Sequence, residues 1–168
     1  AGVVAIAGAK LGETLRSRLG ADVAGGAFLA GGIDSSLLVA LMARRHNGPV
    51  KTFSVGFEGA VGVEDESDDA ADVAAFLRTD HSRVVVTAND AAASVHAIAR
   101  DLDQPTVDGV NSWFVSRSVG GEVKVAISGT GGDELFAGYP WFTALDQHAR
   151  LARQPASRAR ALARCVLG

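Results

Sequence analysis

Two glycine-rich segments constrain the fold of this chain most, because each directly follows a short apolar run and directly precedes a helix-like segment. The first is Ala30–Ser36 (AGGIDSS), which follows the run Ala27–Leu29. The second is Gly129–Gly132 (GTGG), which follows Val123–Ser128. Glycine permits backbone conformations and close approaches that other residues do not. A helix that begins beside such a turn points its free N–H groups and positive dipole end at the same space. Both junctions therefore predict anion-binding turns.

Strand-like and helix-like stretches alternate around these two segments. β-Branched and aromatic content predicts strands at 27–29, 50–57, 83–87 and 123–128. Helical periodicity and end signals predict helices at 33–45, 66–77, 89–100 (capped by Asn89) and 112–119, and one from Asp133 that is interrupted near Pro140. This alternation predicts an α/β fold with a parallel sheet and helices on both faces. Ligands of such sheets bind at the carboxyl ends of the strands, where both glycine segments fall.

Composition limits the class of protein. The chain has 168 residues, of which 48% are hydrophobic, enough for one domain with its own core. Its single cysteine, Cys165, excludes a disulfide framework or a cysteine-rich metal cluster and suits the reducing cytoplasm. A formal net charge of -3 argues against a nucleic-acid binder, and no apolar run reaches the roughly 18 residues of a membrane span.

The first glycine segment carries groups suited to a nucleotide. Gly31 and Gly32 let the backbone approach an anion, and Ser35 and Ser36 add hydroxyl donors in the first helical turn. Asp34 would repel bare phosphate, which indicates Mg²⁺ between its carboxylate and the phosphates. The segment lacks the Gly-Lys-Ser/Thr ending of a Walker loop and the GxGxxG of a dinucleotide fold.

This segment resembles the SGGxDS loop of the ATP pyrophosphatases (PP-loop proteins), which split ATP into AMP and pyrophosphate. The second segment with its surroundings, SGTGGDELFAGYP at 128–140, resembles the SGxGGDELFGGY motif in the synthetase domain of glutamine-dependent asparagine synthetase. Further stretches agree with that family: Thr52–Phe57, Thr79–His81, Asp103–Pro105 and Ser116-Arg117. The resemblance covers about residues 24–142 and implies a Rossmann-like adenine-nucleotide-binding domain.

The family resemblance also implies a reaction. The side-chain carboxylate of L-aspartate, or of a related substrate, would be activated by ATP as an acyl-adenylate (β-aspartyl-AMP) with release of pyrophosphate. Ammonia from a glutaminase domain or subunit would then give asparagine and AMP. We expect ATP and Mg²⁺ as cofactors and neither nucleic acid nor a membrane as a partner, and a homodimer stays open.

Roles for individual residues follow from the same resemblance. Leu29 and Val55 would meet the adenine, mainly through backbone groups and apolar contact. The β- and γ-phosphates would be held by Gly31, Gly32, Ser35 and Ser36, and the ribose and α-phosphate would lie near Ser128 and Gly129. The Mg²⁺ carboxylates would be Asp34 and Asp133, and the catalytic residues would be Asp34, Asp133, Glu134 and Thr130.

Four departures from the family pattern keep alternatives open. Ala30 replaces the loop's first serine, and Thr130 stands where asparagine synthetase usually has glutamate. The chain begins Ala1-Gly2 where a glutaminase would need cysteine, and its three lysines all precede position 125. We therefore expect an N-terminal helical segment (1–23), a synthetase core (24–142) and an arginine-rich, probable fragment end (143–168). The alternatives are a relative that activates another carboxylate, for β-lactam or macrolactam formation, and a truncated nucleotide-binding module without turnover.

Other prominent side chains have plainer interpretations. Six acidic residues between Glu64 and Asp72 predict a solvated loop and helix start, with a lid over the nucleotide as the alternative. The four histidines lack metal-ligand spacing and are predicted at the surface or at helix ends. Packing roles are predicted for Trp113, Phe114, Trp141 and Phe142.

Overall fold

The computed structural model describes residues 2–19, 25–46, 48–59, 66–104, 106 and 109–153. The chain forms two compact units, 1–129 and 130–168. The arginine-rich stretch beyond 153, Cys165, and the acidic residues Glu64 and Asp65 lie outside the described residues. No helix in the described part of the chain is long and apolar enough to cross a bilayer.

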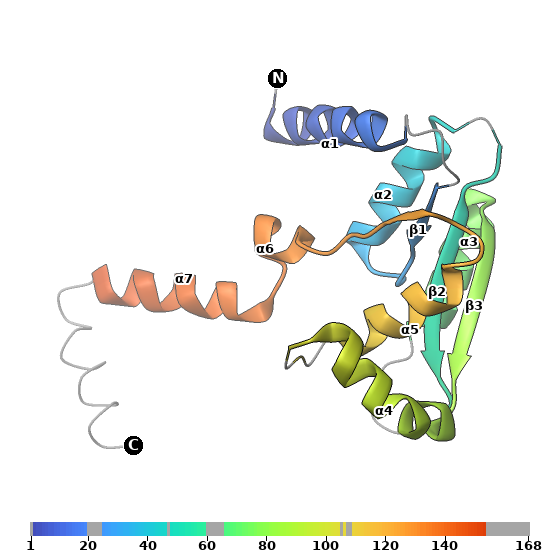
Figure 1. The fold of residues 1–168 in the computed structure, drawn as a ribbon. Coiled ribbons are helices and arrows are strands. Elements are labelled where there is room, and N and C mark those ends of the chain that lie inside the picture. Colours follow the sequence, from blue (N-terminus) through green and yellow to red (C-terminus); the bar gives the residue numbers. More distant parts are fainter. Residues whose placement is uncertain are drawn as a thin grey trace, which may run out of the picture. The chain divides into compact units, whose positions relative to one another are not determined.

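A parallel four-stranded sheet forms the centre of the first unit (Figure 1). Its strands are β1 (Gly25–Phe28), β2 (Lys51–Phe57), β3 (Asp80–Val86) and β4 (Val125–Ile127), in the order β3-β2-β1-β4. In register, Ala27 of β1 lies opposite Thr52 of β2 and Ile127 of β4. The predicted parallel α/β architecture is therefore confirmed, and the two strands that precede the glycine segments are neighbours.

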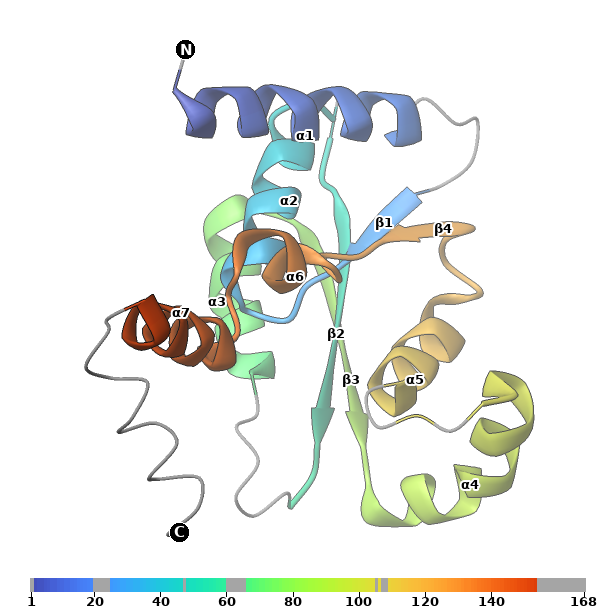
Figure 2. The ribbon, with the colours of Figure 1, turned by 90° about the vertical axis from the view of Figure 1, so that its left-hand side faces the viewer.

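Helices cover both faces of this sheet (Figure 2). The first unit contains α1 (Val3–Leu19), α2 (Ile33–Ala43), α3 (Ser67–Leu77), α4 (Ala88–Leu102) and α5 (Gly109–Val119). On one face, Leu29 of the loop after β1 packs with Val39 and Met42 of α2 and Ala70 of α3. On the other face, Phe53 of β2 packs against α5, so the sheet has a separate core on each side.

Strand β2 shows why the two faces differ. Phe53, Val55 and Phe57 alternate along it and pack on the side of α5, with Trp113 and Phe114 buried there as predicted. The intervening residues Thr52 and Ser54 are buried on the opposite side, toward α3. A period of two places polar side chains on one face of a buried strand, where they require hydrogen-bond partners.

The structure corrects the predicted start of the helix that follows β3. The helix expected from Asn89 begins at Ala88 and is capped by Thr87, which had been assigned to the preceding strand. The Asp90 N–H donates to the Thr87 hydroxyl oxygen (3.1 Å), and the Thr87 N–H donates to the Asp90 carboxylate (3.1 Å). This reciprocal pair is a capping box, which satisfies two backbone donors where Asn89 could satisfy one.

In the second unit, α6 (Gly132–Phe136) and α7 (Pro140–Arg153) follow each other closely. Pro140 is the first residue of α7 and does not interrupt a longer helix. Proline is tolerated at this position because the N–H groups of a first helical turn have no carbonyl partner within the helix. The break is made earlier by Ala137, whose φ of 57° is left-handed and ends α6.

Candidate functional site

The loop that joins β1 to α2 is built by its own backbone and one serine. The Leu29 N–H donates to the Phe53 carbonyl (2.8 Å), which continues the sheet by one residue. The Ala30 N–H donates to the Ser35 hydroxyl oxygen (3.2 Å), which folds the loop back onto α2. Gly31 has a φ of 77°, a left-handed conformation that residues with a side chain rarely adopt.

The N-terminus of α2 is left open by this loop. Gly32 is the N-cap, and no side chain caps the helix. The first N–H group to bond is that of Ser36, which donates to the Gly32 carbonyl (3.1 Å). The N–H groups of Ile33, Asp34 and Ser35 precede it and so have no carbonyl within the helix. Together with the helix dipole they form an anion-binding end.

The two serine hydroxyls are used within the loop in this structure. Ser35 is buried and donates to the Gly32 carbonyl (3.2 Å) while accepting the Ala30 N–H. Ser36 also donates to the Gly32 carbonyl (2.7 Å). Both hydroxyls therefore fix the shape of the glycine loop, and the backbone N–H groups are its remaining donors.

Gly129 brings the second glycine segment to the same helix end. A Cβ atom on Gly129 would lie 2.9 Å from the backbone nitrogen of Ser35 and 3.2 Å from its Cα. Only glycine permits such an approach to a backbone. Because β4 is the neighbour of β1, the chain leaving β4 meets the first turn of α2, as the positions of the two glycine segments predicted.

Leu29 and Val55 do not form a common apolar surface. The Leu29 side chain is fully buried in the core beneath α2 and α3. Val55 is half-buried on the other face of the sheet, against residues of α5. An adenine ring could therefore meet both residues only through their backbone groups. Backbone contact was expected here together with apolar contact.

Asp34 offers a carboxylate with no competing partner among the described residues. It is half-exposed in the first turn of α2 and makes no hydrogen bond or ion pair with any residue the structure describes. Within the same residues, no three His, Cys, Asp or Glu side chains gather as a metal site. The Asp34 carboxylate fits Mg²⁺, which takes one or two carboxylates and fills its remaining positions with phosphate and water.

The predicted site residues of the second unit lie in α6 or just before it. Thr130 is exposed, and Gly131 (φ 96°) is the N-cap of α6. The Asp133 carboxylate lies where a Cβ atom on residue 138 would be, so Gly138 makes room for it. The Tyr139 hydroxyl donates to the Glu134 carboxylate (2.9 Å), and the Tyr139 ring stacks on that of Trp141 with 4.0 Å between centroids.

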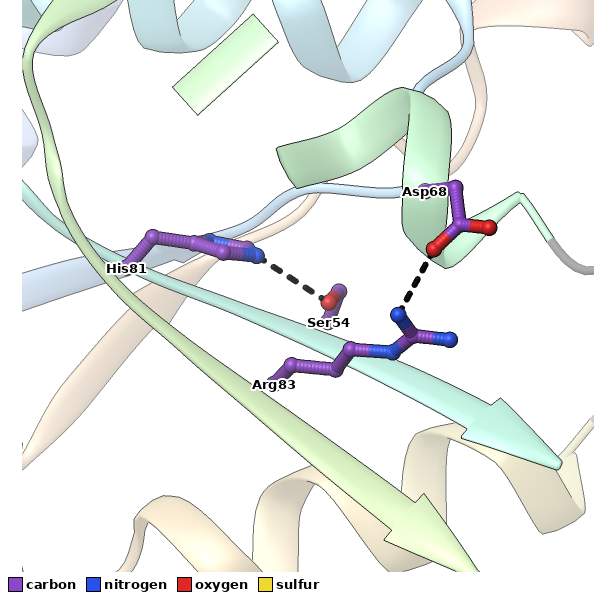
Figure 3. A network of polar contacts seen from close by, with 4 residues as sticks. All are labelled: Ser54, Asp68, His81 and Arg83. Atoms are coloured by element: carbon purple, nitrogen blue, oxygen red, sulfur yellow. Dashed lines mark hydrogen bonds and ion pairs between the residues drawn. The ribbon is translucent and has the colours of Figure 1, made fainter. Parts of the chain in front are cut away.

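A polar network beneath α3 was missed by the sequence analysis (Figure 3). The two ring nitrogens of His81, on β3, bond the hydroxyls of Thr52 (3.0 Å) and Ser54 (3.2 Å) on β2. His81 is half-buried on β3, so the prediction that it lies at the surface or at a helix end is wrong. Burial lowers the pKa of the His81 imidazole below 6.5, a hydrogen bond with the Thr52 backbone opposes this shift, and the nearby Arg83 charge lowers the pKa further.

A cavity of about 380 Å³ lies elsewhere in the first unit, between β3, α4 and α5. Its walls include Val84, Trp113, Phe114 and Arg117. No residue predicted to bind nucleotide lines it. The cavity lies at the edge strand β3, whereas the open N-terminus of α2 lies beside β1 and β4. We therefore assign the candidate site to the glycine loop.

Known proteins resemble this chain in sequence and in fold. The family model for asparagine synthase matches residues 7–167. A Mycobacterium tuberculosis protein with a provisional asparagine synthetase [glutamine-hydrolyzing] name is 42% identical over 133 residues, which are 78% of this chain and 20% of that protein. Asparagine synthetase [glutamine-hydrolyzing] 1 of Bacillus subtilis is 36% identical over 76% of this chain and 20% of its own length.

A solved structure supports the fold independently. The NH3-dependent NAD synthetase from Campylobacter jejuni, solved in complex with the nitrate ion, matches with a TM-score of 0.52 and 16% identity over 79% of this chain and 58% of its own. That likeness confirms the Rossmann-like fold. The chain spans about a fifth of the length of the first relatives named above. The match across nearly the whole chain places it, as the sequence predicted, in the asparagine synthase family.

Proposed function

We propose that this chain is the nucleotide-binding core of an ATP-dependent, amide-forming ligase that acts on aspartate. An oxygen of the aspartate side-chain carboxylate attacks the α-phosphorus of ATP, the bond to the β-phosphate oxygen breaks, and pyrophosphate leaves. Ammonia then attacks the carbonyl carbon of β-aspartyl-AMP, AMP leaves, and the nitrogen loses a proton to give asparagine. The ammonia comes from glutamine hydrolysed by a domain or subunit outside these residues.

The observation that carries this proposal is the open N-terminus of α2 with Gly129 against it. Three backbone N–H groups without helical partners and a positive dipole end suit a polyphosphate. Two neighbouring parallel strands, β1 and β4, end there, which is the usual ligand position in such sheets. Membership of the asparagine synthase family supports ATP as the nucleotide and amide formation as the chemistry.

The proposed nucleotide contacts follow the course of the two loops. The adenine meets the backbone of Leu29 and Val55, and the ribose and α-phosphate lie near Ser128 and Gly129. The leaving phosphates are held by Gly31, Gly32, Ser35 and Ser36. Since the hydroxyls of Ser35 and Ser36 bond within the loop, backbone N–H groups supply most of these contacts.

Asp34 and Asp133 are the carboxylates that would hold Mg²⁺ in this proposal. When bound, the ion supplies positive charge that offsets the negative charge of the phosphates. Within the second unit, Gly138 leaves space for the Asp133 carboxylate. Glu134, held by the Tyr139 hydroxyl, or water accepts the proton from the attacking nitrogen, because the Thr130 hydroxyl is no base near neutral pH.

A second candidate function keeps the same chemistry and changes the substrate. Thr130 stands where asparagine synthetase usually has glutamate, and this favours a relative that activates another carboxylate for lactam formation. In either case we take residues 24–142 as the core and residues 1–23 and 143–168 as its flanks.

Calorimetry of ATP binding with and without Mg²⁺ tests the proposed site. A Cβ on Gly32 would meet nothing within 4 Å, so Gly32→Ala should fold normally yet weaken ATP binding by blocking the phosphates. Loss of one charge-assisted hydrogen bond corresponds to about 10- to 150-fold. Asp34→Ala should remove the Mg²⁺ dependence. Gly121→Ala, which also meets nothing within 4 Å but lies in the turn after α5, is the matched control. Equal affinities in all four proteins would contradict the site.

Pyrophosphate release distinguishes the two candidate substrates. The whole protein that contains this chain should release pyrophosphate with aspartate and ammonia if it is an asparagine synthetase. Release with other carboxylates and none with aspartate would favour the second candidate.

A further inference from the structure

The first turn of α3 lies directly behind the glycine loop. A Cβ atom on Gly31 would come within 2.7 Å of the Cβ of Asp69, 3.0 Å of the Glu66 carbonyl oxygen and 3.1 Å of the Ala70 nitrogen. Two of these three atoms are backbone atoms of the helix. The position of α3 therefore limits where Gly31, and with it the N-cap Gly32, can lie.

Small side chains seat α3 close to the sheet. Ser67, Ala70 and Ala74 are almost completely buried, at 1%, 0% and 2% exposure. The larger apolar contacts of α3, from Val73 and Leu77, come later in the helix. Its first turn (Ser67, Asp68, Asp69) has no apolar side chain. Besides the small buried side chains of Ser67 and Ala70, polar contacts therefore hold the end of α3 that touches the glycine loop.

Arg83 supplies such a contact from the sheet (Figure 3). Its guanidinium donates to the Asp68 carboxylate at 2.7 Å, a short and charge-assisted hydrogen bond. Arg83 is two residues after His81 on β3, and His81 in turn bonds Ser54 of β2. His81 and Arg83 therefore lie on the same face of β3. His81 bonds this strand to β2, and Arg83 bonds it to the first turn of α3.

We propose that the Arg83–Asp68 ion pair is a positioning device for ATP: it holds the first turn of α3 against Gly31 and so fixes the N–H groups that bind the phosphates. Arg83 is a positioning residue, because it acts through α3 and Gly31 and touches no substrate atom. The inference rests on the proposed function and adds residues outside both glycine segments to the machinery of that site.

The size of the expected effect follows from the exposure of the pair. The Arg83 and Asp68 side chains are 37% and 83% exposed, and an exposed ion pair changes an equilibrium constant by about 2- to 5-fold. Arg83→Gln and Asp68→Asn should each weaken ATP binding by about that factor, and the double variant should weaken it by less than the product of the two single effects. Arg83→Asp should weaken binding by about tenfold, since it places a like charge beside Asp68 in an already acidic turn.

Calorimetric measurement of the ATP dissociation constant in the whole protein tests the proposal. The matched control is Lys51→Gln, because Lys51 pairs with Glu122 at 3.3 Å with similar exposure of the lysine (39%), at the first residue of β2. The charge-swapped variant, Arg83→Asp with Asp68→Arg, should recover most of the lost affinity. A purely structural ion pair would lower thermal stability alike in Arg83→Gln and Lys51→Gln and leave ATP affinity unchanged.

Hydrogen exchange without nucleotide separates this inference from the proposed function. Backbone amides of residues 30–36 should exchange faster in Arg83→Gln than in the wild type, and Lys51→Gln should leave them unchanged. If the wild type binds no ATP but this loop exchange rises, the proposed function fails and the coupling stands. Unchanged loop exchange, or an unchanged ATP dissociation constant in Arg83→Gln and Asp68→Asn, overturns the inference.

Discussion

The backbone of Gly129 lies so close to the first turn of α2 that a Cβ atom there would be 2.9 Å from the nitrogen of Ser35. Two segments nearly a hundred residues apart thus meet at a helix end that has no side-chain cap. The contact is between backbones, and for that reason a flexible side chain cannot relieve it.

Gly129→Ala should therefore lower stability and ATP affinity together. The added methyl group must push the chain after β4 away from α2, and overpacking of this kind costs about 1–3 kcal/mol. Urea denaturation gives the stability change, and calorimetry gives the ATP dissociation constant. Gly121→Ala, in open space, should change neither. Wild-type stability in Gly129→Ala would show that the two loops do not touch in solution.

Ala30→Ser should tighten ATP binding without changing the fold. Residue 30 is exposed and its backbone N–H is already used by Ser35, so a new hydroxyl would be free to reach a phosphate. One hydrogen bond to a charged group contributes about 1.5–3 kcal/mol, or roughly 10- to 150-fold in affinity. Ala30→Val is the control of similar size without a donor. Equal ATP affinity in the serine and valine variants would count against a phosphate at this position.

The sequence predicted the glycine segments and their meeting place because both follow strands of a parallel sheet. It did not predict that α3 lies behind Gly31, since that contact depends on how closely Ala70 and Ala74 let the helix approach the sheet. Small residues carry little periodic signal. Distances between helices are decided by tertiary packing, which no local pattern records.

The network of His81 was missed for a different reason, although the sequence contained a signal. The alternation of Thr52 and Ser54 with Phe53 and Val55 places two hydroxyls on one face of a buried strand, and such hydroxyls need partners. The spacing of the histidines along the chain carries no sign of this network. The partners of His81 are instead on the neighbouring strand, where Thr52 lies directly opposite His81 in the register.

His81 should make stability depend on pH between neutral and mildly acidic conditions. Because burial lowers its pKa in the folded protein below the unfolded value of 6.5, the folded state favours neutral imidazole. The contribution is complete above pH 6.5 and is lost as the pH falls through 6.5 toward the lowered folded pKa. Thermal melts at pH 7.5 and 5.5 should show a smaller loss of stability for His81→Gln than for the wild type.

The pH range separates this effect from those of two acidic groups. Hydrogen bonds with Thr87 and with Trp113 lower the pKa of Asp90 and Asp101, respectively, below 3.8, so their contribution is lost only at more acidic pH. An unchanged profile in His81→Gln would mean that His81 does not titrate in this range.

Ala137→Gly should stabilise the turn between α6 and α7. Ala137 has φ 57° and ψ 42°, a left-handed conformation that costs a residue with a Cβ atom about 1–2 kcal/mol and glycine much less. The related motif SGxGGDELFGGY has glycine at this position, so the substitution restores the residue that the backbone favours. Part of the gain is offset by the greater freedom of glycine in the unfolded chain, which leaves about 1 kcal/mol.

Asp103→Gly is the matched comparison for this substitution, because Asp103 ends α4 in the same conformation (φ 50°). Aspartate tolerates left-handed backbone better than alanine does, so the gain there should be smaller. Urea denaturation followed by tryptophan fluorescence measures both, since Trp141 lies four residues from Ala137 and Trp113 reports on the first unit. A loss of stability in Ala137→Gly would show that residue 137 leaves the left-handed conformation in solution, and α6 would then end differently around Asp133 and Glu134.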